Sequence, residues 1–186
     1  MGQNGLLGRN FIILDFLKMQ KGKGTRAVHA GVEHCPATGA IMTPIYQTST
    51  YVQDGVGNHK GYEYSRTLNP TRHALEKALA ELEGAKYGLA FGSGLAAMDN
   101  LMKILKPGDE VISTNDLYGG SYRLFTTVFQ NYGIVFHFVD LSDMDSIKAV
   151  LNENTKMVWI ETPTNPMMQI TDIKAVAETV SGNDVI

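Results

Sequence analysis

Apolar residues recur at helical spacing after residue 70. Four of them stand at i, i+3, i+4 and i+7, namely Leu75, Ala78, Leu79 and Leu82. This spacing is typical of a helix with one buried face. Asn69 is a favoured N-cap, Pro70 suits a first helical turn, and Gly84 is a common helix end. The pattern therefore predicts an amphipathic helix that begins near residue 70 and ends near Gly84.

Short apolar runs alternate with helical patterns in the rest of the chain. The runs predict strands at 87–91, 111–113, 134–139 and 157–160. Helical spacing and capping residues predict helices at about 94–105, 120–131, 143–151 and 172–180. This alternation is typical of a parallel sheet covered on both faces, because right-handed crossovers place helices there. We therefore expect an α/β fold with three αβα layers and a mostly parallel sheet.

The start of the chain lacks a sustained helical or strand period. Residues 25–68 are rich in Gly, Thr and Tyr and contain prolines, which predicts an extended arm. Residues 1–24 are expected to be an extension or a flexible lead, with Met19 as a natural start. The apolar run 11–17 within this lead contains Asp15 and is far shorter than the ~20 residues of a membrane span.

The composition is that of a folded, soluble domain. Hydrophobic residues make up 44% of the 186 residues and charged residues 19%, which argues against a disordered or fibrous chain. The formal net charge of −3 gives no general electrostatic reason to bind nucleic acid or an anionic membrane, so we expect a small-molecule partner. The single cysteine, Cys35, allows no intrachain disulfide and favours a reducing compartment, the cytoplasm.

Ligands of open α/β sheets bind at the carboxyl ends of strands, so the loops after the predicted strands are where chemistry is expected. The first such loop reads Gly92-Ser93-Gly94-Leu95 and opens a helix. Glycines let a ligand approach the backbone, and the free amides of a helix start, together with the Ser93 hydroxyl, suit a phosphate. A plain tight turn is the alternative, because the run matches neither the dinucleotide-binding nor the P-loop pattern.

Two further loops carry residues suited to a flat, polar ligand. Tyr118 stands before Gly119-Gly120, where its ring could stack on a ligand and its phenol could exchange a proton. The alternative is a tyrosine that caps a turn. Glu161 and Asn165 stand in a loop stiffened by two prolines, which would hold these polar groups at a strand end. The alternative there is a plain proline-stiffened turn.

The arm contributes a fourth motif, Tyr64-Ser65-Arg66. The guanidinium of Arg66 could clamp a phosphate with two parallel hydrogen bonds, and the alternative is a solvated surface charge. Another run, from His29 to Cys35, holds two histidines, a glutamate and a cysteine, but its spacing matches no zinc pattern. We therefore predict no metal site.

The motifs occur in the order Tyr64-Ser65-Arg66, Gly92-Ser93-Gly94, Tyr118-Gly119-Gly120 and Glu161-Thr162-Pro163-Thr164-Asn165-Pro166. At these intervals they resemble the pyridoxal-phosphate enzymes of cysteine and methionine metabolism, from about Thr25 to Val180. The run from Tyr118 to Phe125 is most similar to cystathionine γ-synthases and γ-lyases, whereas methionine γ-lyases tend to have cysteine at the position of Gly120. The resemblance thus implies a trans-sulfuration enzyme.

The resemblance also implies a fold, a cofactor and an assembly. Residues 69–186 would be the first part of the cofactor-binding large domain of fold-type I pyridoxal-phosphate-dependent transferases, incomplete at the carboxyl end. Residues 25–68 would be an arm that contacts a neighbouring subunit. The implied cofactor is pyridoxal 5'-phosphate, and the implied assembly is a homo-oligomer, a tetramer built from dimers with shared active sites. The implied substrate is a small amino acid, and no nucleic acid or membrane partner is expected.

The same resemblance implies a set of cofactor-binding residues: Tyr64, Arg66, Ser93, Gly94, Leu95, Tyr118, Glu161 and Asn165. The residues of the glycine turn would hold the phosphate at a helix start, and the tyrosine and arginine of the arm would reach the phosphate of a neighbouring subunit. Tyr118 would stack on the pyridine ring and, as the catalytic residue, assist proton movements. Glu161 and Asn165 would lie beside the ring, with Asn165 near its 3-oxygen and the substrate carboxylate.

The implied function is γ-replacement or γ-elimination on sulfur amino acids or activated homoserine, with synthase and lyase left open. In the family, the aspartate that pairs with the pyridine nitrogen and the lysine that forms the Schiff base follow the last predicted helix. No equivalent is found before Ile186, so the 186-residue chain is expected to be inactive alone. Two alternatives stay open: a non-catalytic truncated module for assembly or cofactor binding, and an O-acetylhomoserine sulfhydrylase-type enzyme.

Overall fold

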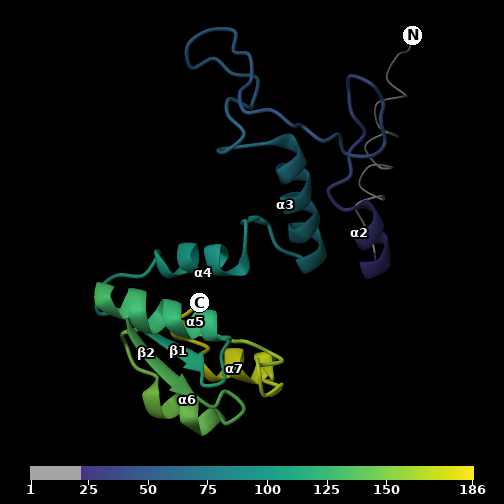
Figure 1. Cartoon of the computed structure of the whole chain (residues 1–186). Coiled ribbons are helices and arrows are strands. Elements are labelled where there is room, and N and C mark those ends of the chain that lie inside the picture. The colour runs from purple at the N-terminus through teal and green to yellow at the C-terminus, as the bar shows by residue number, and fades with distance from the viewer. Residues whose placement is uncertain (1–21) are drawn as a thin grey trace, which may run out of the picture. The chain divides into compact units, whose positions relative to one another are not determined.

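The computed structural model describes residues 22–186 (Figure 1). The chain divides into two compact units, one that ends at Ala90 and one that begins at Phe91. The apolar run 11–17, Met19 and the other residues before 22 lie outside the described part. Within residues 22–186, no helix has the length and apolar character that a membrane crossing requires.

The first unit is organised around a long helix, α3 (Pro70–Glu83). The side chain of Asn69, its N-cap, accepts a hydrogen bond from the Thr71 amide at 2.9 Å, which satisfies one free amide of the first turn. Gly84 ends the helix with a φ of 68°, a left-handed conformation that favours glycine. The predicted helix, its cap and its end are confirmed.

A short helix, α2 (Lys23–His29), packs against α3. The Arg26 guanidinium donates a hydrogen bond to the Glu81 carbonyl oxygen at 3.0 Å. Gly31 follows with a φ of 69°, and a Cβ there would lie only 2.8 Å from the Ala78 Cβ of α3. The sequence predicts an extended arm from residue 25, and this prediction is wrong for α2. The helix has no regular apolar spacing in its sequence and is held instead by its contacts with α3.

The predicted strand at 87–91 is also wrong. These residues pair with no strand among the described residues. The Ala90 amide, which a neighbouring strand would otherwise bind, donates to the Glu76 carboxylate at 3.1 Å. Gly88 lies so close to α3 that a Cβ there would be 3.3 Å from the Ala80 amide nitrogen. The segment is thus held by α3 and not by a sheet.

The second unit contains a parallel three-stranded sheet in the order β2-β1-β3. Its strands are β1 (Glu110–Thr114), β2 (Val135–Val139) and β3 (Thr155–Trp159). Ile112 of β1 lies between His137 of β2 and Val158 of β3, so β1 is the central strand. The Ile186 amide donates to Lys156 at 3.0 Å and its carbonyl accepts from Val158 at 2.7 Å, so backbone pairing continues beyond β3. The predicted parallel sheet is confirmed.

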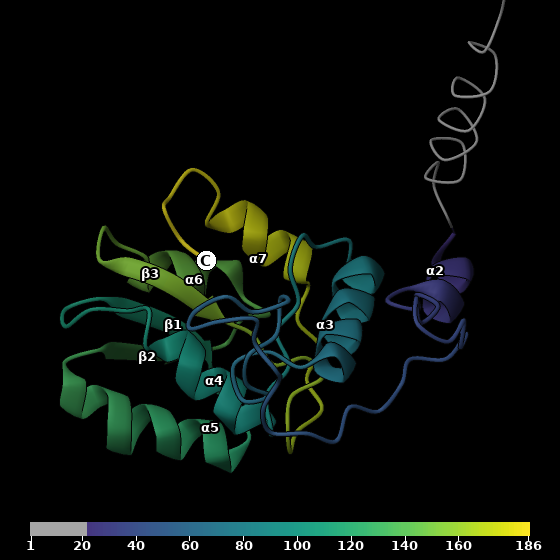
Figure 2. The same cartoon turned by 90° about the horizontal axis from the view of Figure 1, so that it is seen from above.

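The helices of the second unit lie where the sequence predicts them, α4 before β1 and the others after strands. The regular ones are α4 (Gly94–Met102), α5 (Gly119–Arg123), α6 (Met144–Val150) and α7 (Ile173–Thr179). The helix predicted at 120–131 is one continuous run that changes pitch, since α5 passes into a π-helix (Leu124–Val128) and then a 3-10 helix (Phe129–Tyr132). Figure 2 shows α4 and α5 on one face of the sheet and α6 and α7 on the other, so the α/β layers are confirmed.

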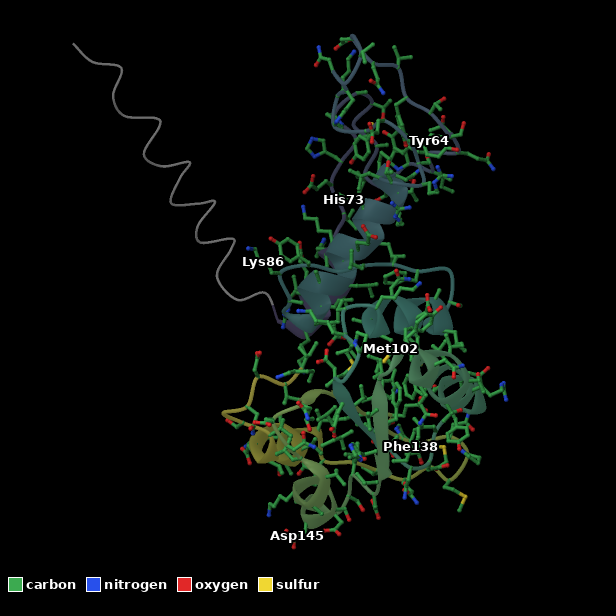
Figure 3. The ribbon with its side chains drawn as sticks, turned by 90° about the vertical axis from the view of Figure 1, so that its left-hand side faces the viewer. Tyr64, His73, Lys86, Met102, Phe138 and Asp145 are labelled. Atoms are coloured by element: carbon green, nitrogen blue, oxygen red, sulfur yellow. The ribbon has the colours of Figure 1, made fainter. Side chains whose placement is uncertain are left out.

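Each face of the sheet has its own apolar core. Alternate residues of β1 point to opposite faces, so Val111 and Ile112, both fully buried, belong to different clusters. The first cluster is rich in aromatic and methionine side chains: Met98, Met102, Val111, Leu117, Phe125, Phe129, Ile134, Phe136 and Met157. The second is aliphatic: Ile112, Leu141, Ile147 and Val176. Figure 3 shows Met102 and Phe138 near the sheet, whereas Asp145 lies at the outer surface of α6.

The amino end of the sheet carries a polar cluster centred on Glu110. The Glu110 carboxylate accepts a hydrogen bond from the Asn152 side-chain amide at 2.8 Å, and His137 Nε2 lies 2.6 Å from the same oxygen. These hydrogen bonds hold the pKa of Glu110 below its ordinary value, and the bond from Asn152 has the largest effect. The cluster ties β1 to β2 and to the turn before β3, at the end of the sheet opposite to the one where ligands of such sheets bind.

Candidate functional site

The glycine turn opens α4 as predicted. The Ser93 hydroxyl oxygen caps the helix by accepting a hydrogen bond from the Ala96 amide at 3.1 Å. Among the residues that the structure describes, the amides of Gly94 and Leu95 donate to no protein acceptor. These amides stand at the positive end of the helix dipole, where an anion is stabilised. The turn therefore offers donors that an anionic ligand would satisfy.

Tyr118 lies in the loop after β1 as the N-cap of α5, and it is 48% exposed. Its amide donates a hydrogen bond to Glu161 Oε2 at 2.9 Å, which fixes the backbone that carries the ring. Gly120 lies where any side chain would clash, because a Cβ there would overlap the Tyr118 ring and lie 2.7 Å from Leu95 Cδ1. Tyr118 and Leu95, predicted to bind one cofactor, are thus close together.

Glu161 links two elements of the sheet's carboxyl end. Its Oε1 accepts a hydrogen bond from the Ser121 hydroxyl at 2.7 Å, while its Oε2 accepts from the Tyr118 amide. Ser121 is fully buried, and the Trp159 indole nitrogen lies 3.5 Å from Glu161 Oε1. Both carboxylate oxygens are therefore engaged by protein donors. Direct contact of Glu161 with a cofactor ring stays a prediction.

Asn165 lies in the loop after β3, and its side chain is exposed. The residue before it, Thr164, is buried, and its hydroxyl donates a hydrogen bond to Asp116 Oδ2. The Met167 amide donates to the same oxygen at 2.9 Å. Asp116 precedes Tyr118 by two residues, so the loops that carry Tyr118 and Asn165 are joined to each other.

Tyr64 and Arg66 belong to the first unit. The Arg66 guanidinium carbon lies 4.9 Å from the centre of the Tyr64 ring, so the pair forms a cation–π contact. Arg72 of α3 holds the backbone beneath this pair, donating to the carbonyl oxygens of Ser65 at 3.1 Å and Thr67 at 2.7 Å. Figure 3 shows Tyr64 near the amino end of α3. The pair is thus presented on a well-supported loop, and its action on a phosphate stays a prediction.

Sequence reasoning missed the residues that join the loops. Ser121, Asp116 and Thr164 are ordinary polar residues in the printed sequence, and their partners lie 40 to 48 positions away. The signal that was present is position, since Asp116 and Thr164 each stand within four residues of a predicted strand end. No group of three or more His, Cys, Asp or Glu side chains within residues 22–186 is arranged to hold a metal ion.

The second unit meets the physical requirements of a site for an aromatic phosphate. Unpaired helix-start amides, a half-exposed tyrosine ring and a close-approach glycine all lie at the carboxyl end of one parallel sheet. The free donors fit a phosphate, and the tyrosine face fits a flat ring. These features are those that an α/β domain binding a phosphate-bearing ligand would need.

Comparison with known proteins makes the assignment specific. Residues 24–186 match the family described as Cys/Met metabolism PLP-dependent enzyme, and the chain belongs to this family. The chain is 52% identical over 158 residues to a probable cystathionine gamma-synthase of Herpetosiphon aurantiacus, covering 85% of this chain and 50% of that protein. It is 47% identical over 163 residues to a cystathionine beta-lyase of Coxiella burnetii, covering 87% and 42% respectively.

Solved structures agree with the fold. The crystal structure of metB from Corynebacterium glutamicum matches with a TM-score of 0.85 at 49% identity, over 89% of this chain and 44% of that one. The crystal structure of cystathionine gamma-lyase from Lactobacillus plantarum complexed with L-serine matches with a TM-score of 0.84 at 40% identity, over 89% and 43%. The chain thus spans about half the length of these relatives, and the predicted family and α/β fold are confirmed.

Proposed function

We propose that this chain forms the amino-terminal part of a pyridoxal-phosphate-dependent trans-sulfuration enzyme. The observation that carries the proposal is the pair of free amides at Gly94 and Leu95, which stands close to the Tyr118 ring through the contact of Leu95 with Gly120. Membership of the family supports the choice of cofactor. When bound, pyridoxal phosphate stabilises the negative charge that develops at Cα of an amino-acid substrate.

The residues of this chain would hold and orient the cofactor. The amides of Gly94 and Leu95, with the Ser93 hydroxyl, would bind the phosphate through charge-assisted hydrogen bonds. The Tyr118 ring would cover one face of the pyridine ring, and its phenol would carry protons near the substrate. Glu161 would keep the Tyr118 backbone in place, and Asn165 would bond the 3-oxygen and the substrate carboxylate.

The reaction we favour is γ-replacement or γ-elimination at a sulfur amino acid or activated homoserine. Relatives named cystathionine gamma-synthase and cystathionine gamma-lyase, the latter 49% identical over 158 residues in Dictyostelium discoideum, support this reaction. Relatives named cystathionine beta-lyase add β-elimination of the same substrate as the competing reaction. The two eliminations release different keto acids and γ-replacement releases none, so products distinguish the three reactions.

We also propose that the 186-residue chain does not turn over substrate by itself. Lys103, Lys148 and Lys174 each pair with a carboxylate of their own helix, with nitrogen–oxygen distances of 2.5, 2.9 and 3.7 Å. Within residues 91–186, no lysine amine forms a hydrogen bond or ion pair with Tyr118 or Glu161. We propose that a covalent amine for the cofactor comes from outside this set of residues.

The partner we propose is a second copy of the protein. The supported Tyr64–Arg66 pair would reach the phosphate in a neighbouring subunit, and residues 25–68 would form the arm that crosses to it. A site completed by two copies requires a homo-oligomer, for which we propose a tetramer built as a dimer of dimers. Cytoplasmic location is part of the proposal, because Cys35 is the only cysteine and allows no intrachain disulfide.

The test supplies the complete protein and the 186-residue chain with pyridoxal phosphate. Binding is followed through the fluorescence of Trp159, the only tryptophan of the chain, whose indole lies beside Glu161. L-cystathionine is then offered: 2-oxobutanoate indicates γ-elimination and pyruvate indicates β-elimination. With O-succinylhomoserine and cysteine, formation of cystathionine indicates a synthase. We expect γ-type products from the complete protein and none from the chain. Turnover by the chain alone, or no cofactor binding by the complete protein, would contradict the proposal.

A further inference from the structure

Asp116 joins two loops at the carboxyl end of the sheet through one carboxylate oxygen. Its Oδ2 accepts hydrogen bonds from the Thr164 hydroxyl and from the Met167 amide, the latter at 2.9 Å. Because Asp116 lies in the loop after β1 and the donors lie in the loop after β3, the carboxylate fixes the second loop to the first.

The loop after β3 closes on itself around the same threonine. The Thr164 hydroxyl oxygen accepts a hydrogen bond from the Gln169 amide at 2.8 Å, and the Thr164 amide donates to the Gln169 carbonyl at 3.0 Å. Thr164 is only 1% exposed, whereas its neighbours Asn165 and Met167 are exposed. The buried Thr164 hydroxyl thus accepts a hydrogen bond from within its own loop and donates one to Asp116 in the loop after β1.

Asn165 sits on the outside of this closed loop. Among the described residues, its side chain makes no hydrogen bond, so no partner of its own sets its position. What holds its backbone is the set of bonds on either side, at Thr164 and Met167, and both end on Asp116. The place of the Asn165 amide therefore depends on a residue that is not adjacent to it in sequence.

We propose that Asp116 is the positioning residue for Asn165: it holds the loop after β3 so that the Asn165 amide meets the cofactor at a set distance from the Tyr118 ring. This inference rests on the proposed function. The proposal assigns Asp116 the role of a hydrogen-bond acceptor, and both of its donors reach one oxygen. An asparagine whose amide oxygen takes that place keeps both bonds.

The proposal predicts that the effects of replacing Asp116 and Asn165 on cofactor binding are not additive. If Asp116 acts only through Asn165, removal of either residue weakens the cofactor's interaction with the loop in the same way. The two changes together then do little more than one alone. A residue that merely stabilised the fold would instead lower affinity independently of Asn165, and the effects would add.

The experiment uses the complete protein reconstituted with pyridoxal phosphate, with D116A, D116N, N165A and D116A/N165A. The control is D143A. Asp143 also accepts from a hydroxyl and an amide, at 2.7 Å from Ser146 and 3.0 Å from Asp145, but it caps α6. The readouts are cofactor dissociation constant, the pH dependence of the bound cofactor's absorption band, and hydrogen exchange of the Met167 and Gln169 amides.

We expect D116A to weaken cofactor binding about tenfold, the size of one lost hydrogen bond, and to shift the pH dependence of the absorption band as N165A does. The double variant matches the single variants, D116N restores wild-type values, and D143A leaves the band unchanged. Exchange of the Met167 and Gln169 amides rises at least tenfold in D116A and in D116A/N165A, and does not rise in D116N or D143A.

Three results overturn the inference. Additive effects of D116A and N165A would show that Asp116 acts independently of Asn165. A wild-type band in D116A would show that the loop needs no such anchor, and a D116N variant that behaves as D116A would assign the effect to charge. If D116A fails to fold, T164V, which removes the hydroxyl at almost constant shape, must reproduce the shift of N165A. Failure of the wild-type protein to bind the cofactor would instead contradict the proposed function itself.

Discussion

At each end of the parallel sheet, a glutamate carboxylate accepts hydrogen bonds from other elements, but the two carboxylates hold different parts of the structure in place. At the amino end, Glu110 accepts hydrogen bonds from Asn152 and pairs with His137, and all three belong to strands or their entries. At the carboxyl end, Glu161 accepts from the Ser121 hydroxyl and the Tyr118 amide, which belong to the loop and helix after β1. One carboxylate joins strands, and the other holds a loop that presents a ring.

The difference lies in what each cluster leaves free. The amino-end carboxylate is bound by the side chains of Asn152 and His137, and no tyrosine ring or unpaired helix amide accompanies it among the contacts described for it. The carboxyl-end carboxylate binds an amide and a hydroxyl and leaves the Tyr118 ring half-exposed. We therefore expect changes at the amino end to alter stability alone and changes at the carboxyl end to alter cofactor binding as well.

The largest expected effect comes from replacing Glu161 with leucine. E161L leaves the fully buried Ser121 hydroxyl and the Tyr118 amide without their acceptor, which costs about 1–3 kcal/mol for a buried polar group. It should also weaken cofactor binding, because Tyr118 loses its backbone anchor. E161Q is the matched control, since its side-chain oxygen can accept from the Tyr118 amide and its side-chain NH2 group can donate to the Ser121 hydroxyl oxygen. Urea unfolding and cofactor titration compare the two, and equal stability of E161L and E161Q would contradict the assignment.

A smaller effect is expected at two helix caps. S93A and D172A each remove an N-cap, of α4 and α7, and each should lower the free energy of unfolding by about 1 kcal/mol. Only S93A should also weaken pyridoxal phosphate binding, because only Ser93 stands at the proposed phosphate site. Thermal unfolding with and without cofactor separates the loss of stability from the loss of cofactor affinity. Equal loss of cofactor affinity in both variants would place the phosphate somewhere other than the start of α4.

The regular elements could be predicted from the sequence because their signals are local. The cap and spacing of α3 lie within 16 residues, and the strands β1, β2 and β3 are short apolar runs bounded by turns. The failures had non-local causes. The 87–91 run has the composition of a strand, yet its Ala90 amide is bound by Glu76 of α3, and α2 depends on α3 for its contacts.

The candidate site was predictable in part for the same reason. Tyr118 stands in the loop after β1, so its placement at the carboxyl end of the sheet follows from a parallel topology. Among the residues that the structure describes, Gly94 follows no strand, and its place near that end shows only in the approach of Leu95 to Gly120. The hydrogen bonds that join the loops could not be predicted in this way. Nothing local distinguishes Ser121 or Asp116 from other polar residues, and their hydrogen bonds to Glu161 and Thr164 exist only once the sheet has brought the loops together.

The smallest expected effect is the pH dependence of stability at the amino end. The pKa of Glu110 is lowered in the folded protein, chiefly by Asn152 and then by His137. Its contribution to stability is therefore full above the unfolded pKa and is lost as pH falls through the folded pKa. Urea unfolding between pH 7 and pH 3 should show this loss in the wild type and a smaller loss in E110Q. An identical pH dependence in both would contradict the role of Glu110, and cofactor affinity at pH 7 should be unchanged in E110Q.

The central claim is that the start of α4 and the ring of Tyr118 form the two sides of one cofactor site. The most direct test is a crystal structure of the complete protein with pyridoxal phosphate. The account predicts the phosphate on the amides of Gly94 and Leu95 and the pyridine ring against Tyr118. A phosphate bound away from those amides, or a pyridine ring that does not touch Tyr118, would contradict it.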